Sequence, residues 1–159
     1  MKKQNLFLIC PECYIENAIR DKYGDSYFLT ALGTVFNIDE FEYAEEVNQF
    51  ITNESIGTIY IVNDSSCTFI KNTIEGVNNS NTQAERVLKS IINNNKKQFD
   101  GLSDKKQLMK LARLNTYRQA YELLNVAFIG NKIKDNHIKL KGLIYDRASS
   151  HFSEFDIEI

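Results

Sequence analysis

The chain has 159 residues, a formal net charge of -2, one proline, two histidines, three cysteines and no tryptophan. Its length fits one domain over residues 1–159. Hydrophobic residues make up 43% of the chain and charged residues 25%, which is typical of a globular protein. The charge balance argues against a nucleic-acid-binding protein, which usually carries a basic stripe. No apolar run near the start is long enough for a signal peptide or a membrane span. We therefore expect a cytoplasmic protein without a disulfide framework.

The first third of the chain alternates between strand and helix patterns. Leu6 to Cys10 is a continuous apolar run that predicts a buried strand, and it stops at Pro11, which suits the first turn of a helix. Apolar residues then recur at helical spacing up to Gly24. Ser26 to Leu32 predicts a second strand, and Ile38 to Phe50 predicts a helix with one apolar face.

The rest of the chain continues this alternation. Thr58 to Val62 is β-branched and apolar on both faces, which indicates a buried parallel strand. The later segments are helices over 68–74, 84–92 and 104–124, a loop over 78–81, a break at 93–95, a strand over 138–145 and an apolar segment over 152–157. Strands that alternate with helices predict an α/β domain around a mainly parallel sheet.

Two predicted strands end in turns that carry cysteines. The first turn is Cys10-Pro11-Glu12-Cys13, and the second holds Asp64 and Cys67, again three residues apart. Because the carboxyl ends of adjacent parallel strands meet at one edge of a sheet, we expect both turns to share one pocket. Thiolate and carboxylate ligands that converge suit Zn²⁺, but cysteine is also often buried as a small apolar side chain. The spacing alone leaves a metal site and a metal-free core both open.

A dithiol redox site is a further alternative for the first turn. A strand, then Cys10-Pro11-Glu12-Cys13, then a helix is typical of thioredoxin-like proteins, where the helix N-terminus lowers the pKa of the first thiol. That fold sets a cis-proline opposite the dithiol, and Pro11 is the single proline of this chain. The redox role of Cys10 and Cys13 is therefore the less favoured interpretation.

The sequence resembles the β-carbonic anhydrases over nearly its whole length. Five segments match the family's motifs in the family's order, and they are Cys10–Tyr14, Thr30–Thr34, Glu40–Ala44, Asn63–Thr68 and Lys141–Asp146. The second of these keeps only the glycine of its motif, whereas the third matches well. The resemblance implies an α/β fold with a mainly parallel sheet of four or five strands flanked by helices. It also implies a homodimer, Zn²⁺ as cofactor and CO₂ or bicarbonate as the small-molecule partner.

The same resemblance assigns positions to the site residues. Cys10 and Cys67 stand where the family has its two cysteine ligands, and Asp64 stands where it has the ligand histidine. Glu12 takes the place of the family's catalytic aspartate, and Tyr14 takes that of the arginine which pairs with it. The cation of this acid–arginine pair is thus missing from its usual place.

These departures predict altered chemistry. Zinc held by Cys10, Asp64 and Cys67 would face three anionic ligands, which lowers its Lewis acidity. Without an arginine partner, Glu12 is free to reach the metal, and Cys13 is a further candidate ligand. We therefore expect a divergent β-carbonic-anhydrase-like protein, metal-binding or metal-free, without efficient CO₂ hydration. The alternative is an active zinc lyase or hydrolase that uses the Cys-Asp-Cys set.

Overall fold

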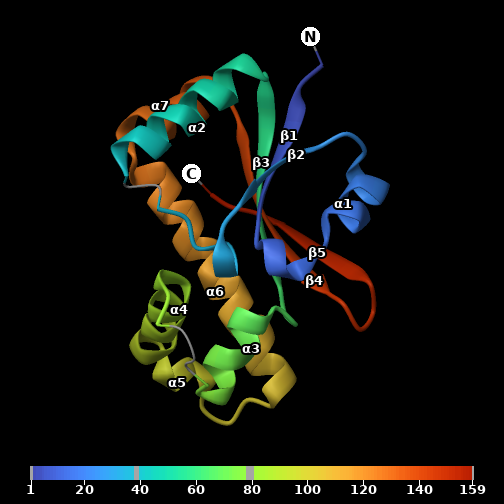
Figure 1. Ribbon diagram of the computed structural model, residues 1–159, viewed down its shortest axis with the longest axis vertical. Helices are drawn as coiled ribbons and strands as arrows, with labels where there is room; N and C mark the ends of the chain where they lie inside the picture. Colours follow the sequence, from blue (N-terminus) through green and yellow to red (C-terminus); the bar gives the residue numbers. More distant parts are fainter. Residues whose placement is uncertain (1, 38–39, 78–80, 159) are drawn as a thin grey trace.

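A five-stranded sheet organises the part of the chain that the structure describes, residues 2–37, 40–77 and 81–158 of a computed structural model. The strands follow the order β2-β1-β3-β4-β5. Their bounds are β1 Gln4–Ile9, β2 Tyr27–Thr30, β3 Ile56–Asp64, β4 Lys139–Asp146 and β5 His151–Asp156. The first four strands run parallel, and β5 pairs antiparallel with β4 (Figure 1). The predicted α/β fold with a mainly parallel sheet is confirmed.

Helices connect the strands and flank the sheet. They are α1 Glu16–Tyr23, α2 Phe41–Asn53, α3 Thr68–Glu75, α4 Gln83–Asn94, α5 Lys96–Phe99, α6 Asp104–Asn125 and α7 Ala127–Asp135, with two short 3-10 helices, η1 Pro11–Cys13 and η2 Leu32–Thr34. The predicted helices are confirmed within a few residues at their ends, except for the first. The helix predicted from Pro11 to Gly24 is divided into η1 and α1 by the left-handed backbone of Tyr14. The predicted start at Ile38 lies outside the described residues, as do 78–80 of the predicted loop.

Helix α7 was not expected from the sequence. It contains Gly130, and glycine lowers the helix propensity of a short segment. In the structure a Cβ at this position would overlap the carbonyl oxygen of Leu124 in α6. Glycine therefore allows α7 to turn back closely against α6, which local propensity does not reveal.

The two faces of the sheet pack in separate hydrophobic clusters. Leu6 and Leu8 of β1 lie in a cluster with residues of α2, α7 and the second half of α6. Phe7 and Ile9 lie in a second cluster with residues of α1, α3, α4 and the first half of α6. Both sets alternate along β1, as side chains of a strand point to opposite faces. The strand is therefore buried on both sides, as its continuous apolar run predicts.

The carboxyl ends of the parallel strands lie together at one end of the sheet, near the middle of the molecule (Figure 1). Figure 1 shows η1 after β1 and η2 after β2 side by side there, with the start of α3 after β3 below them. None of the described helices is long and apolar enough to cross a membrane. This end of the sheet positions the cysteines.

Candidate metal centre

The three cysteines of the chain converge at the carboxyl ends of β1 and β3. Cys10 follows β1, Cys13 ends η1, and Cys67 is the residue before α3, and all three are free and buried. Their sulfur atoms lie within 4.8 Å of one another, and the Sγ atoms of Cys10 and Cys67 are 3.7 Å apart. The two predicted turns thus meet, as expected for adjacent parallel strands.

Both turns are closed by a backbone hydrogen bond between residues three apart, which is the spacing that they share. The Cys13 N–H donates to the Cys10 carbonyl at 3.2 Å, and the Cys67 N–H donates to the Asp64 carbonyl at 3.0 Å. The Ser65 N–H donates to the Tyr145 carbonyl at 3.1 Å, which fixes the second turn to the end of β4. Each turn folds its last cysteine back toward the end of its own strand.

The cluster favours one thiolate, on Cys10. Its pKa is lowered because Cys13, Cys67 and the Gly33 N–H hydrogen-bond to its sulfur and stabilise the charged form. The pKa of Cys13 and that of Cys67 are raised, since each thiol hydrogen-bonds to Cys10 and a second charge would be buried beside the first. A cation at the centre of the three sulfurs would relieve that repulsion.

Asp64 lies beside the thiols but is engaged elsewhere. Its side chain is 1% exposed, and its Oδ1 accepts the Ser66 N–H at 2.7 Å. Its Oδ2 accepts from Nη2 of Arg147 at 2.8 Å, and the same nitrogen donates to the carbonyl oxygen of Cys13. Asp64 is therefore absent from the group of possible ligand atoms that lie within 4.8 Å of one another among the described residues.

Arg147 was not identified from the sequence. It directly follows the Tyr145-Asp146 end of the last resembling segment, in the connection between β4 and β5. Its partner Asp64 is 83 residues away, so no local spacing reveals the pair. The one sequence feature that could have indicated Arg147 is its position next to the family-like segment Lys141–Asp146.

The other predicted site residues lie outside the group of possible ligands. Glu12 is exposed on η1, and neither it nor Tyr14 belongs to the group of possible ligands. The side chain of Tyr14 is 79% exposed, and its backbone is left-handed, with φ 51°. The two histidines of the chain, His137 and His151, were not predicted as ligands and are exposed. The structure therefore brings together Cys10, Cys13 and Cys67.

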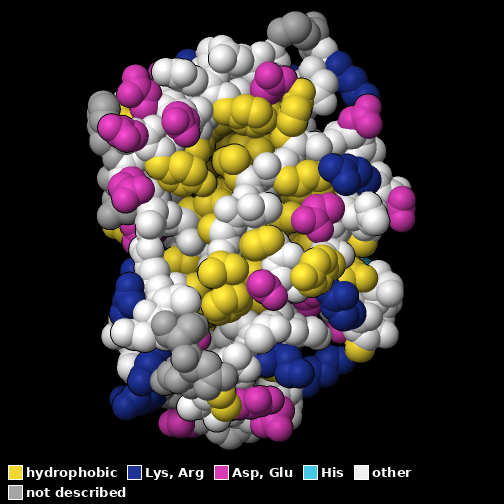
Figure 2. Space-filling view, viewed as in Figure 1, with side chains coloured by type: hydrophobic (Ala, Val, Ile, Leu, Met, Phe, Trp, Pro, Cys, Tyr) yellow, Lys and Arg dark blue, Asp and Glu magenta, His cyan; other side chains and the backbone are white. Residues whose placement is uncertain are grey.

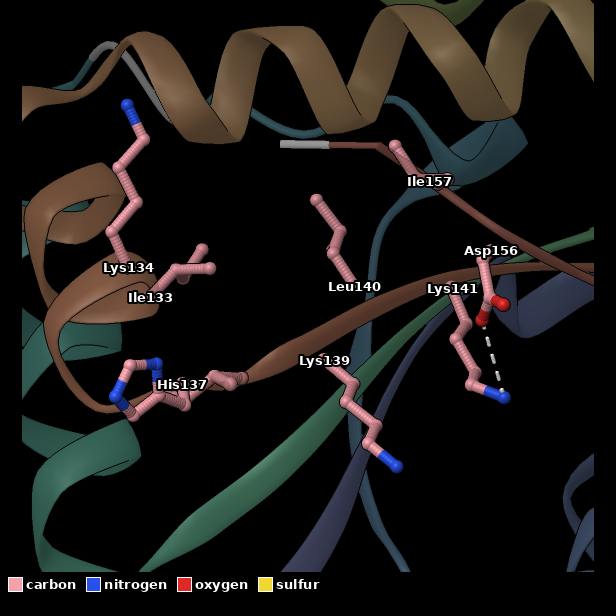
Figure 3. Close-up of a pocket in the computed structure, with 9 residues that line it drawn as sticks. Ile133, Lys134, His137, Lys139, Leu140, Lys141, Asp156 and Ile157 are labelled. Carbon is pink, nitrogen blue, oxygen red and sulfur yellow. Dashed lines mark ion pairs between the residues drawn. The ribbon is translucent and has the colours of Figure 1, made fainter.

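A separate hollow of about 580 Å³ lies at the opposite end of β4, next to α7 (Figure 3). Three lysines border it, but Lys134 and Lys139 extend in different directions, and Lys141 is paired with Asp156 at 3.4 Å. Its polar groups do not converge on one point. The thiol cluster is therefore the stronger candidate for a functional site.

The geometry of the three thiols fits a zinc ion. Tetrahedral Zn²⁺ with Zn–S bonds of about 2.3 Å places neighbouring sulfur atoms about 3.8 Å apart. The 3.7 Å between Cys10 and Cys67 agrees with that separation. Three buried thiols are also the donor set that thiophilic metals prefer. Three protein sulfurs leave a fourth position of the tetrahedron for another ligand.

No protein-family model and no curated sequence matches the chain. Among solved structures, the β-carbonic anhydrase CafD of Aspergillus fumigatus (E54A mutant) is 18% identical with a TM-score of 0.81, and the match covers 99% of this chain and 90% of that one. A match from the crystal structures of two tetrameric β-carbonic anhydrases of Sordaria macrospora is 14% identical with a TM-score of 0.78. It covers 96% of this chain and 80% of that one. The Coccomyxa β-carbonic anhydrase in complex with acetazolamide is 13% identical with a TM-score of 0.75, and the match covers 96% of this chain and 72% of that one. The chain has the β-carbonic anhydrase fold.

Proposed function

We propose that the chain is a divergent member of the β-carbonic anhydrase family, a single domain whose Cys10, Cys13 and Cys67 bind one zinc ion. We propose further that it does not hydrate CO₂ efficiently. The observation that carries this proposal is the convergence of a third thiol, Cys13, on the two cysteines at the family's ligand positions. A zinc ion in such a site supplies Lewis acidity, and its strength depends on the charge of its ligands.

The ligand charge argues against efficient hydration. Three thiolates neutralise more of the zinc charge than two thiolates and an imidazole, so the Lewis acidity of the metal falls. Asp64 and Arg147 already satisfy each other, and Glu12 is exposed. The described residues near the sulfur cluster therefore favour metal binding over a catalytic role, which would need groups that bind a substrate and transfer a proton.

An active enzyme is the second candidate. It would use Cys10, Asp64 and Cys67 as ligands, with CO₂ or bicarbonate as the small-molecule substrate. The fold shared with carbonic anhydrases favours it. Asp64 would then have to leave Arg147 and turn toward the metal. The dithiol redox role of Cys10 and Cys13 is a minor third alternative.

We also propose a cytoplasmic homodimer. Its support is the edge strand β2, whose hydrophobic residues are only partly buried within one copy of the chain. Figure 2 shows hydrophobic side chains gathered on the face over α2 and β2. Free buried thiols suit a reducing compartment.

Metal content and ligand substitution test this proposal. The protein purified with zinc should contain one zinc per chain by elemental analysis, with a CO₂ hydration rate in stopped flow near that of the buffer. Cys13→Ser should lower the zinc affinity about 100-fold, as expected when one of about four ligands is lost. Asp64→Asn is the matched control and should leave the affinity within a few-fold.

The outcomes separate the candidates. Rapid hydration together with loss of zinc in Asp64→Asn would establish the Cys-Asp-Cys enzyme instead. A wild-type protein that binds no zinc would refute the metal site. Retention of full zinc affinity in Cys13→Ser would remove the third thiol from the ligand set.

A further inference from the structure

A buried polar network lies next to the metal centre, between α6 and the ends of β2 and β3. Asn63, Asn115, Thr116 and Gln119 are each 3% exposed or less, although the surrounding core is apolar. Nδ2 of Asn63 donates to Oγ1 of Thr116 at 2.9 Å, and Nε2 of Gln119 donates to Oδ1 of Asn115 at 3.4 Å. Buried amides cost stability unless they are hydrogen-bonded, so these contacts need a structural or functional reason.

Asn115 is the centre of this network. Its Nδ2 group has two hydrogens, and it donates to the Gly33 carbonyl at 3.0 Å and to Oδ1 of Asn63 at 2.9 Å. The first of these bonds leaves α6 and reaches the 3-10 helix η2, 82 residues away in sequence. Gln119 holds the same loop, since its Oε1 accepts the Phe36 N–H at 3.0 Å.

The loop held by Asn115 contacts the metal centre. The Gly33 N–H donates to Sγ of Cys10 at 3.1 Å, within a buried environment. Gly33 has φ +64°, and a Cβ there would be 3.0 Å from Cβ of Ala84. Only glycine adopts this conformation in this space without strain. The direction of the N–H therefore depends on how the Gly33 backbone is fixed, and Asn115 fixes its carbonyl.

We propose that Asn115 is a positioning residue for the Cys10 sulfur: it holds the Gly33 backbone so that its N–H stays hydrogen-bonded to Sγ of Cys10. This inference rests on the proposed metal site and adds a residue on α6 to it. An N–H···S bond withdraws electron density from a metal-bound thiolate, and partners behind the ligands orient them and tune the metal. Asn115 thus sets both the orientation and the donor strength of one ligand.

A side chain that only fills the core would act differently. Thr116 is the adjacent residue of the same network and is also fully buried, yet its Oγ1 contacts Asn63 and the Ala112 carbonyl rather than the η2 loop. Thr116→Val keeps the shape and removes the hydroxyl. It should lower stability by a cost similar to that of Asn115→Leu without disturbing Gly33. A comparison of Asn115→Leu with Thr116→Val therefore distinguishes an effect on the position of Gly33 from a general loss of core stability.

The first experiment compares these variants loaded with Co²⁺. In Asn115→Leu the sulfur-to-cobalt charge-transfer band should move to lower energy, because the thiolate of Cys10 loses its hydrogen bond. Its Co²⁺ affinity should fall about 10-fold, the usual size of such effects. In Thr116→Val the band should stay in place and the affinity should change less than about 3-fold. An unshifted band and unchanged affinity in folded Asn115→Leu would overturn the inference.

A second measurement uses the wild-type protein and does not depend on the folding of any variant. With ¹¹³Cd²⁺ bound, NMR should detect a scalar coupling between the metal and the Gly33 amide proton, and one between Nδ2 of Asn115 and the Gly33 carbonyl carbon. Absence of either coupling would overturn the inference alone. Failure of the wild type to bind Co²⁺ and Cd²⁺ would overturn the proposed metal site, and the inference with it.

Discussion

Asp64 and Arg147 show how single residues set the character of the thiol site. Asp64 stands at the position of a ligand in the resembling family, yet both of its oxygens are hydrogen-bonded, to the Ser66 N–H and to Arg147. Arg147 also donates to the carbonyl of Cys13, so one guanidinium connects both cysteine-bearing turns. Such a bridge stabilises the turns and keeps the buried carboxylate paired.

Removal of this guanidinium should destabilise the protein. Arg147→Met leaves the carboxylate of Asp64, only 1% exposed, with one of its two partners missing. The expected loss is about 1–3 kcal/mol in the free energy of unfolding, measured by urea denaturation of the metal-free protein. Lys105→Met is the control: it breaks the exposed 3.8 Å pair with Asp146 and should cost at most about 0.5 kcal/mol. Equal losses for the two variants would contradict a special role for Arg147.

At the scale of elements, two glycines leave room for a neighbouring element, Gly142 in β4 for β5 and Gly130 in α7 for α6. Gly142 of β4 pairs with Phe155 of β5, and the Phe155 ring covers the position that a Cβ on Gly142 would take. That ring also packs against Tyr117, with centroids 5.5 Å apart, and lies under the Arg113 guanidinium at 4.2 Å. A movement of the ring would therefore disturb both of these contacts. Glycine in β4 thus couples the last hairpin to α6.

Gly142→Ala should destabilise this hairpin. The added methyl group displaces the Phe155 ring, and overpacking of this kind costs about 1–3 kcal/mol. Thermal or urea unfolding measures the loss. The double variant Gly142→Ala/Phe155→Leu should recover part of it relative to the sum of the single changes, because the smaller side chain makes room. Additive losses would show that the ring does not restrict residue 142.

At the scale of the whole molecule, the sheet has one edge formed by a short strand, β2. Leu32, the first residue of η2, lies two residues beyond the end of that strand and is 42% exposed. An edge strand offers unpaired backbone groups, and exposed hydrophobic side chains beside it favour association. These features support the proposed homodimer at this edge.

Charge at this edge should separate the copies. Leu32→Asp should convert the dimer to a monomer in analytical ultracentrifugation, because an interface that buries an unpaired carboxylate is strongly disfavoured. Val77→Asp is the control, since Val77 is similarly exposed, at 39%, but follows α3 rather than β2. Dimers that persist in Leu32→Asp would place the interface elsewhere, and a monomeric wild type would refute the homodimer.

Local patterns in the sequence determined most of the element types, α7 excepted, and the meeting of the two cysteine turns. The apolar run of β1 and the β-branched run of β3 reflect burial on both faces, a property that each segment carries in its own residues. Once both are parallel neighbours, Cys10, Cys13 and Cys67 must lie at the same edge of the sheet. That inference needs spacing and topology alone.

Only the tertiary structure decided which side chains act beside the thiols. Arg147 reaches Asp64 across 83 residues, and Asn115 reaches Gly33 across 82, so neither partner is visible in a local pattern. Helix α7 likewise depends on the close approach of Gly130 to α6. Hydrophobic periodicity reports whether a residue is buried, but the hydrogen-bond partner of a buried polar group is set by the packing of distant elements. For this reason the cysteines could be found from the sequence, whereas the residues that hold them in place could not.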